Sequence, residues 1–323
     1  MTTRFRAAVL TAAAATSVLA LTACSNGTTS SGSGYKISFI QGVAGDEFYV
    51  TMQCGIQSEA KKLGVTVNTQ GPAKFDPTLQ KPIVDSVSAS RPNAILIAPT
   101  DTTAMRAPLQ AAASAGAKVV LVDTTVDNPS FATAQVSSDN VGGGTAAFQA
   151  IKTLNPHGGK VLVMSTDPGI STTDARIAGF EKAVKADPSF TYLGVQYSHD
   201  DPATAAKLIT AALAKDPDIV GVFAANTFAA EGTGTGVRQA GKQNQVKVIG
   251  FDAGPDQMAL LKAGTVQALI AQDPYSIGIQ GLDQAVNALK GQKVTTPIQT
   301  GFHVITAANL ATDGAKYAYK SSC

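Results

Sequence analysis

The sequence predicts an α/β protein with two doubly wound, Rossmann-like lobes, each a parallel sheet covered by helices. Three observations support this fold class. From residue 35 onward, short apolar runs rich in β-branched residues alternate with longer helical stretches. These runs form two series, separated by a small, polar, glycine-rich segment at residues 133–144. An apolar stretch ending at Cys24 precedes both series, so it stands apart from the folded protein. Regular strand–helix alternation is typical of parallel sheets.

The N-terminal segment has the layout of a secretory signal peptide over residues 1–23. Arg4 and Arg6 supply a positive start, and residues 7–23 are uncharged and mostly apolar. The sequence LTAC at residues 21–24 resembles the bacterial lipobox, a signal in which the chain is cut before a cysteine that then carries lipid.

We therefore expect Cys24 to be lipidated with diacylglycerol and an N-acyl chain such as palmitate. More than one acyl chain gives stable membrane attachment. The alternative is an ordinary signal peptide with an incidental cysteine. Residues 24–34 are small and polar, so they predict a flexible tether. The expected location is the extracytoplasmic face of the cell membrane.

Composition narrows the function of the remaining chain. About 300 residues follow the signal, enough for two domains of ordinary size. Charged residues make up 15%, the formal net charge is +2, and there is no basic block, which argues against a nucleic-acid surface. Aromatic residues make up 6% and Trp is absent, so a ligand site has few rings available.

Three cysteines occur, at positions 24, 54 and 323. With Cys24 lipidated, Cys54 and Cys323 remain as a pair in an oxidising compartment. We expect a disulfide that attaches the C-terminus to the first helix. The alternative is two separate free thiols.

The first series begins at residue 35. A helix over residues 47–64 has Asp46 as N-cap and Gly64 at its C-terminal end. The other helices are expected at residues 77–90 and 103–115. The expected strands are residues 35–41, 65–70, 94–99 and 118–123.

The second series begins near residue 160. Its expected strands are residues 160–165, 191–197, 219–225, 246–252 and 266–272. Its expected helices are residues 174–186, 202–215, 229–240 and 255–263. The glycine runs at residues 142–144 and 232–236 lack the Lys-Ser/Thr of a phosphate-binding loop, so they predict packing or capping glycines.

Two segments are candidates for crossings between the lobes, residues 133–144 and 272–278. The expected division follows from them. The N-terminal lobe takes residues 35–138 and 273–306. The C-terminal lobe and tail take residues 139–272 and 307–323.

Polar and aromatic residues follow the expected strands, at the edge where open parallel sheets bind ligands. Each of these residues is also a common cap or turn former. Together they predict one polar cleft between two lobes, suited to a sugar or polyol whose hydroxyls both donate and accept hydrogen bonds. The residues are Asp46, Phe48, Tyr49, Asp123, Asn226, Asp252 and Gln272, with Arg176 as a donor.

These segments resemble the periplasmic sugar-binding proteins of ABC transporters, of the ribose-binding type. The resemblance covers nearly all of residues 35–308 and follows the family's order. It rests on these motifs: EFYVTMQCGIQSEAKKLG, ILIAPTDTTA, VSSDNVGGG, ARIAGF, VFAANT, VIGFDAGPD and ALIAQDPYSIG. The resemblance implies the type I periplasmic binding protein fold, with a multi-strand hinge. It also implies a monomer that needs no cofactor and delivers sugar to ABC permease subunits.

The resemblance implies ligand contacts at the same positions, with Arg176 in the family's R-x-x-G-F motif. Two arginines of the ribose-binding pattern are replaced, by Thr124 and by Asp174, and Asp174 is counted among the expected contacts. The segment YSHDD at residues 197–201 replaces one that contains an aromatic residue. These departures keep the ligand class and argue against ribose itself.

An enzyme is disfavoured because His157, His199 and His303 lack metal-ligand spacing and no nucleophile elbow is present, so no metal site is expected. Asp200 and Asp201 are expected to cap the following helix. A sensor that presents its closed form to a receptor or kinase remains an alternative to transport.

Overall fold

Two six-stranded sheets organise residues 34–323, the part of the chain that the computed structural model describes. The expected signal peptide, the lipidation at Cys24 and residues 24–33 of the expected tether lie outside the described residues. No helix within residues 34–323 is long and apolar enough to cross a membrane. Each sheet has helices on both faces, so the predicted fold class is confirmed.

All strand pairs of the first sheet are parallel. Its middle strands are almost entirely buried apolar residues, as expected for a sheet covered on both faces. The strand order is β11 (Ile298–Thr300), β5 (Ala134–Ser138), β4 (Lys118–Val122), β3 (Ala94–Ile97), β1 (Lys36–Ile40) and β2 (Thr66–Gln70).

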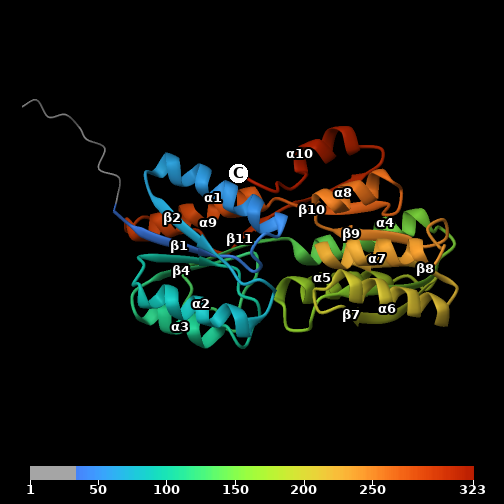
Figure 1. Cartoon of the computed structure of the whole chain (residues 1–323), viewed down its shortest axis with the longest axis horizontal. Coiled ribbons are helices and arrows are strands. Elements are labelled where there is room, and N and C mark those ends of the chain that lie inside the picture. The colour runs from blue at the N-terminus through green and yellow to red at the C-terminus, as the bar shows by residue number, and fades with distance from the viewer. Residues whose placement is uncertain (1–33) are drawn as a thin grey trace, which may run out of the picture. The chain divides into compact units, whose positions relative to one another are not determined.

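Four helices cover the first sheet. α1 (Glu47–Leu63) and α9 (Pro274–Leu289) pack together on one face. α2 (Pro77–Ala89) and α3 (Arg106–Ser114) cover the other face. Figure 1 shows the two pairs on opposite sides of the strands.

The second sheet is parallel except at one edge, where the last strand runs antiparallel to its neighbour. The strand order is β12 (Phe302–Thr306), β10 (Ala268–Gln272), β9 (Lys247–Phe251), β8 (Ile219–Ala224), β6 (Gly159–Ser165) and β7 (Phe190–Tyr197).

Five helices cover the second sheet. α4 (Asn140–Leu154) and α5 (Ser171–Lys185) form one layer, where Phe148 of α4 contacts Phe180 of α5 edge to face. The opposite layer contains α6 (Pro202–Lys215), α7 (Thr227–Gln239) and α8 (Pro255–Lys262).

The chain passes between the sheets at three points, Asp139, Asp273 and Gly301. Asp139 caps α4, and Asp273 caps α9. The expected division of the chain assigned residues 302–306 to the first lobe, which is wrong for these five residues. They form β12, which pairs with β10 in the second sheet.

Several elements were not predicted, and each has a physical reason. β5 alternates polar and apolar residues instead of forming an apolar run. α4 begins with three glycines among its first five residues, which lowers its intrinsic helix propensity. Its stability comes from packing, because Gly143 faces the Phe251 ring and Gly144 faces the backbone of α5.

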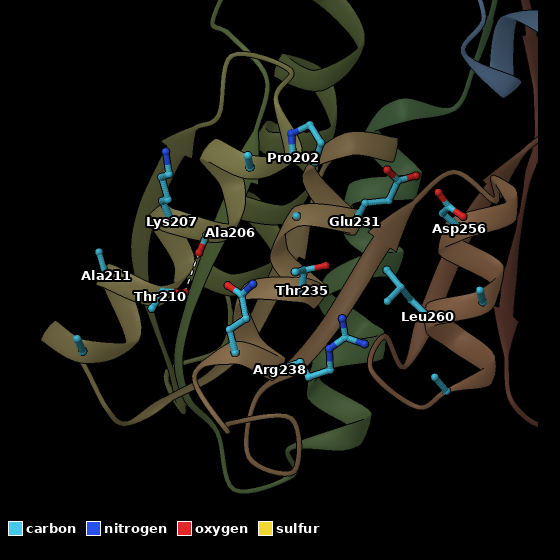
Figure 2. Close-up of a pocket in the computed structure, with 16 residues that line it drawn as sticks. Pro202, Ala206, Lys207, Thr210, Ala211, Glu231, Thr235, Arg238, Asp256 and Leu260 are labelled. Carbon is cyan, nitrogen blue, oxygen red and sulfur yellow. Dashed lines mark hydrogen bonds between the residues drawn. The ribbon is translucent and has the colours of Figure 1, made fainter.

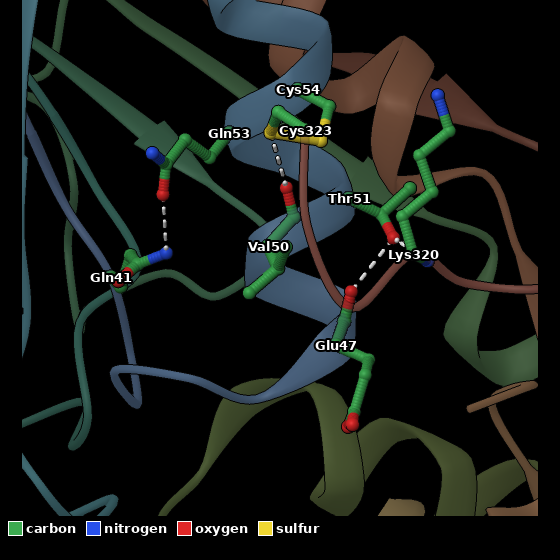
Figure 3. The surroundings of a disulfide bond; sticks show 8 residues. All are labelled: Gln41, Glu47, Val50, Thr51, Gln53, Cys54, Lys320 and Cys323. Atoms are coloured by element: carbon green, nitrogen blue, oxygen red, sulfur yellow. Dashed lines mark hydrogen bonds between the residues drawn. A yellow bond between two sulfur atoms is a disulfide. The ribbon is translucent and has the colours of Figure 1, made fainter. Parts of the chain in front are cut away.

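The C-terminal tail follows β12 through a π-helical turn (Leu310–Gly314) and the short helix α10 (Ala315–Tyr317). It then returns to α1, where the predicted disulfide between Cys54 and Cys323 is present, with 5.2 Å between the Cα atoms. Figure 3 shows this disulfide, together with the Lys320 amide, which donates to Thr51 Oγ1 over 2.7 Å.

Candidate functional site: a polar pocket between the sheets

A polar pocket lies at the carboxyl ends of strands from both sheets, the position at which open parallel sheets bind ligands. It brings together eight of the nine side chains that the sequence indicated: Asp46, Phe48, Tyr49, Asp123, Arg176, Asn226, Asp252 and Gln272. The sequence therefore identified most of its lining.

The first lobe contributes the start of α1 to the pocket. Asp46 is the N-cap of this helix and accepts a hydrogen bond from the Phe48 amide over 2.8 Å. Phe48 and Tyr49 occupy the first turn, with ring centroids 5.1 Å apart in an edge-to-face arrangement. Their placement follows from the cap, because Asp46 sets where the helix begins.

Asp123 and Asp252 occupy equivalent places in the two lobes, directly after β4 and β9. Both have left-handed backbone, with φ of 64° and 79°. Each amide donates to the next strand of its own sheet, to Val136 and Ile270 respectively. This turn ends the strand and directs the carboxylate into the pocket, and Asp tolerates the conformation better than most residues.

Asp252 is the most fully hydrogen-bonded carboxylate of the pocket. Its Oδ1 accepts from Gln272 Nε2 over 2.7 Å and from the Tyr319 hydroxyl over 3.1 Å. Its Oδ2 accepts from Thr227 Oγ1 over 3.3 Å. Tyr319 comes from the C-terminal tail, and its hydroxyl also accepts from the Gln272 amide. These bonds hold Asp252 and Gln272 in one orientation.

Arg176 is buried, with 3% of its surface exposed. Its Nε donates to Asn140 Oδ1 over 2.9 Å, and its Nη1 donates to the Ala225 carbonyl over 2.8 Å. The guanidinium carbon lies 3.7 Å from the centroid of the Phe251 ring. The side chain is therefore held from three sides as it faces the pocket.

Asn226 and Asp200 form a pair on the second lobe. Asn226 caps α7 through its Oδ1, and its Nδ2 donates to Asp200 Oδ1 over 2.7 Å. Asp200 was expected to cap a helix, but it lines the pocket. The expected capping role is correct for Asp201, which is the N-cap of α6. The signal for Asp200 was its position after β7, at the same sheet edge as the other site residues.

Asp174 is the one expected contact that lies outside the pocket. It is exposed on α5 and accepts from the Gly169 amide over 3.0 Å, because its helical position points it away from Arg176. Other lining side chains were not anticipated and carry no distinctive sequence signal: Phe75, Thr166, Ile170, Thr172, Thr173 and Thr227.

Burial shifts the acidity of the pocket carboxyl groups. Burial raises the pKa of Asp123 to about 6, although the nearby Arg176 charge and the 2.8 Å hydrogen bond from the Tyr49 hydroxyl act in the opposite direction. Burial also raises the pKa of Asp200 to about 6, against the hydrogen bond from Asn226. For Asp46, burial and then the charge of Asp252 raise the pKa well above its ordinary value.

A second hollow lies on the second lobe, between α6, α7 and α8, and is larger than the pocket (Figure 2). Short side chains such as Ala206, Thr210 and Thr235 line it, together with Leu260. It lies beside helices and not at strand ends, and it brings together none of the expected site residues. The polar pocket is therefore the candidate site for a ligand.

Similarity to known proteins agrees with this geometry. Residues 37–293 match the family described as periplasmic binding protein domain. The chain belongs to this family. Within residues 34–323, no cluster of three or more His, Cys, Asp or Glu side chains could hold a metal ion.

This periplasmic binding protein has relatives among sugar-transport proteins. It is 32% identical over 290 residues to the ribose import binding protein of Bacillus subtilis, covering 87% of this chain and 93% of the relative. It is 31% identical to the D-allose-binding periplasmic protein of Escherichia coli, covering 76% of this chain and 82% of the relative.

Among solved structures, an ABC transporter solute-binding protein from Agrobacterium vitis, bound to α-D-tagatopyranose, is similar with a TM-score of 0.87. That protein is 38% identical, and the match covers 88% of this chain and 99% of the other. These relatives are binding proteins of transport systems, so this chain is a binding protein and not an enzyme.

Proposed function

We propose that this protein captures a sugar or polyol in the pocket between its lobes and delivers it to the permease of an ABC importer. The observation that carries the proposal is the pocket itself, where buried carboxylate, amide and guanidinium groups from both sheets surround two aromatic rings. Such groups match a ring with hydroxyls at its edge and C–H groups on its face. Its relatives are named for ribose and allose, and its structural neighbour holds a ketohexose.

Ligand capture in this proposal requires the lobes to separate and close. The free volume at the centre of the pocket is about 50 Å³. Small-molecule pockets usually have volumes of about 300 Å³ or more, so a sugar needs a more open arrangement to enter. Hydrogen bonds between the lobes favour closure, among them Thr102 N to the Gly169 carbonyl at 3.0 Å and Thr125 N to Ser171 Oγ at 2.9 Å. A ligand bridging both lobes stabilises the closed state by its differential affinity.

The ligand screen that tests this proposal is a thermal-shift series with pentoses, hexoses and polyols. A ligand that binds only the folded state raises its melting temperature by mass action. Calorimetry then gives the affinity of each ligand found. If no sugar or polyol shifts the melting temperature or binds in the calorimeter, the proposed function is wrong.

The substitution Asp252→Asn tests whether the ligand binds in this pocket. Asn keeps the shape of the side chain and tolerates the left-handed backbone, but it removes the charge that accepts ligand hydroxyls. We expect binding to weaken by about 2 kcal/mol or more and the melting temperature of the unliganded protein to change little. Asp201→Asn is the control, because Asn also serves as an N-cap and Asp201 does not line the pocket. Unchanged affinity in Asp252→Asn would mean that the site lies elsewhere.

The lipid anchor is a separate part of the proposal. It rests on the LTAC sequence before a polar tether, and it would place the binding protein at the membrane beside its permease. We expect Cys24→Ala to abolish lipid attachment, so that the protein is released or left unprocessed. Cell fractionation and mass spectrometry of the N-terminus measure this. A correctly cleaved Cys24→Ala protein that stays in the membrane fraction would contradict the anchor.

A further inference from the structure

We propose that the pocket prefers a polyhydroxy ligand carrying a protonated amine over the neutral ligand of the same shape. This inference rests on the proposed function and specifies the ligand class. It concerns the charges of the pocket, the hydrogen-bonding atoms that the protein leaves without partners, and the charges at the pocket entrance.

The pocket contains more negative than positive charge. Four carboxylates line it, from Asp46, Asp123, Asp200 and Asp252, and Arg176 is the one Lys or Arg side chain in the lining. Within residues 34–323, none of the four carboxylates forms an ion pair within 4.0 Å. A neutral sugar would leave this excess uncompensated, whereas an ammonium group would reduce it.

The positive charge of Arg176 acts unequally on the pocket. It lowers the pKa of Asp123 and that of Tyr319, the partner of Asp252, whereas it is not among the main influences on the pKa of Asp46 or Asp200. The hydrogen bonds to Asp200 and Asp46 come from the Asn226 amide group and the Phe48 backbone amide, which are neutral. An ammonium group would find its best partners in Asp46 and Asp200, whose charges repel each other.

Two side chains of the pocket lining have a buried acceptor atom without a partner. Asp123 Oδ1 and Gln272 Oε1 have no hydrogen-bond partner, and their side chains are 6% and 2% exposed. Both side chains line the pocket. Leaving buried acceptors unpaired is unfavourable, so the ligand must supply donors. An ammonium group supplies three donors and no acceptor, whereas a hydroxyl supplies one donor.

The entrance to the pocket has the same charge. The outer hollow shares Asp46 and Asp200 with the pocket. Seven further acidic side chains line it, including Asp101, Asp167 and Glu231, and Lys74 is the one Lys or Arg side chain in its lining. A cleft lined by one sign of charge concentrates ligands of the opposite sign and speeds their association. The approach therefore favours a cation over a neutral molecule.

The test compares matched ligand pairs by calorimetry on the purified full-length protein in detergent at pH 7. The pairs are D-galactose with D-galactosamine, D-glucose with D-glucosamine, and myo-inositol with the inositol in which one hydroxyl is replaced by an amine. We expect the aminated member of the pair that fits to bind at least about tenfold more tightly. We also expect its association rate to fall more steeply with salt than that of the neutral member.

Asp200→Asn and Asp46→Asn test the site of the amine. Each should lower the affinity for the aminated ligand more than the affinity for its neutral partner, so that the ratio of the two affinities falls towards one. Asn keeps the shape of both side chains and the N-cap role of Asp46. Asp85→Asn is the control, because it also removes one negative charge, and Asp85 is an exposed partner of Lys81 on α2 that lines neither the pocket nor the outer hollow. This control should leave both affinities unchanged.

The outcomes separate the inference from the proposed function. Neutral ligands that bind as tightly as their aminated partners overturn the inference and leave the proposed function in place. Binding by neither kind of ligand overturns both. If a variant fails to fold, the comparison of ligand pairs on the unaltered protein still decides the matter.

Discussion

Single residues at strand ends determine the chemistry of the pocket. Asp123 and Asp252 use the same left-handed turn in both lobes to leave the sheet and enter the pocket. A non-glycine residue in this conformation costs on the order of 1 kcal/mol. Each carboxylate is also buried away from water, to 6% and 4% exposure. The turns and the buried charges therefore lower the stability of the unliganded protein.

The buried carboxyl of Asp123 predicts a pH dependence of stability. Its folded-state pKa of about 6 lies above its ordinary value of 3.8, so the folded state binds this proton more tightly than the unfolded state. Its contribution to stability therefore falls as pH rises from about 4 to about 6 and is constant above that. We expect Asp123→Asn to be more stable than the unaltered protein at pH 7.5, by up to about 3 kcal/mol, with the difference vanishing towards pH 4.

Urea unfolding of the unliganded protein at several pH values measures this difference. Asp85→Asn, which removes an exposed carboxylate, should show no comparable gain at pH 7.5. If Asp123→Asn is destabilised equally at every pH, the carboxylate serves chiefly as the partner of the Tyr49 hydroxyl.

At the scale of elements, the close packing of α4 against α5 positions the guanidinium group. Asn140 at the start of α4 accepts from Arg176 Nε, and this bond requires the two helix backbones to lie close together. Gly144 allows the approach, because a Cβ at this position would overlap the carbonyl oxygen of Arg176. The glycine run lowers the helix propensity of α4, but it allows the close packing that positions Arg176.

Gly144→Ala should therefore push the two helices apart. We expect the free energy of unfolding to fall by about 1–3 kcal/mol, as for overpacked cores, and ligand affinity to fall because Arg176 moves. Thermal unfolding and calorimetry measure the two effects. Gly301→Ala is the control, because Gly301 has open space at its Cβ position and no left-handed backbone. The melting temperature of the Gly301→Ala protein should therefore change little. A normal melting temperature for Gly144→Ala would contradict the packing argument.

At the scale of the whole described chain, the C-terminal tail connects the two lobes. The Tyr319 amide donates to the Ala253 carbonyl of the second lobe, and the next residue, Lys320, donates to Thr51 on α1 of the first. The disulfide then joins the last residue to α1 across 269 positions of sequence. The tail is also part of the pocket's support, because the Tyr319 hydroxyl donates to Asp252.

Cys323→Ser should weaken both the fold and the pocket. Removing a disulfide that closes so long a loop typically lowers the free energy of unfolding by about 2–4 kcal/mol, through the unfolded chain in the entropic account. We expect a lower melting temperature and a lower ligand affinity, because Tyr319 is held less firmly. Tyr319→Phe should separate the effects, since it removes the hydrogen bond to Asp252 at a stability cost of about 1 kcal/mol and keeps the disulfide. If affinity survives both variants, the tail only stabilises the fold.

The sequence by itself determined the fold class, the disulfide pair and eight lining residues of the pocket. The fold class and the strand-end residues depend on local pattern, because strand and helix periodicity is set within a few residues and parallel strands bring their carboxyl ends to one edge. The disulfide pair follows from the number of cysteines that remain in an oxidising compartment. The positions of Asp123, Asp252 and Gln272 follow from the strand-end rule without knowledge of their contacts.

Only the tertiary structure decided the remaining features, because they depend on contacts between residues far apart in sequence. Tyr319 reaches Asp252 from 67 positions away, and nothing in the local sequence around either residue indicates this. β12 belongs to the second sheet because it pairs with β10, and α4 is helical because its glycines fit against Phe251 and α5. Asp200 lines the pocket and Asp174 does not for the same reason, since the direction of a side chain at a loop or helix start is set by what packs around it.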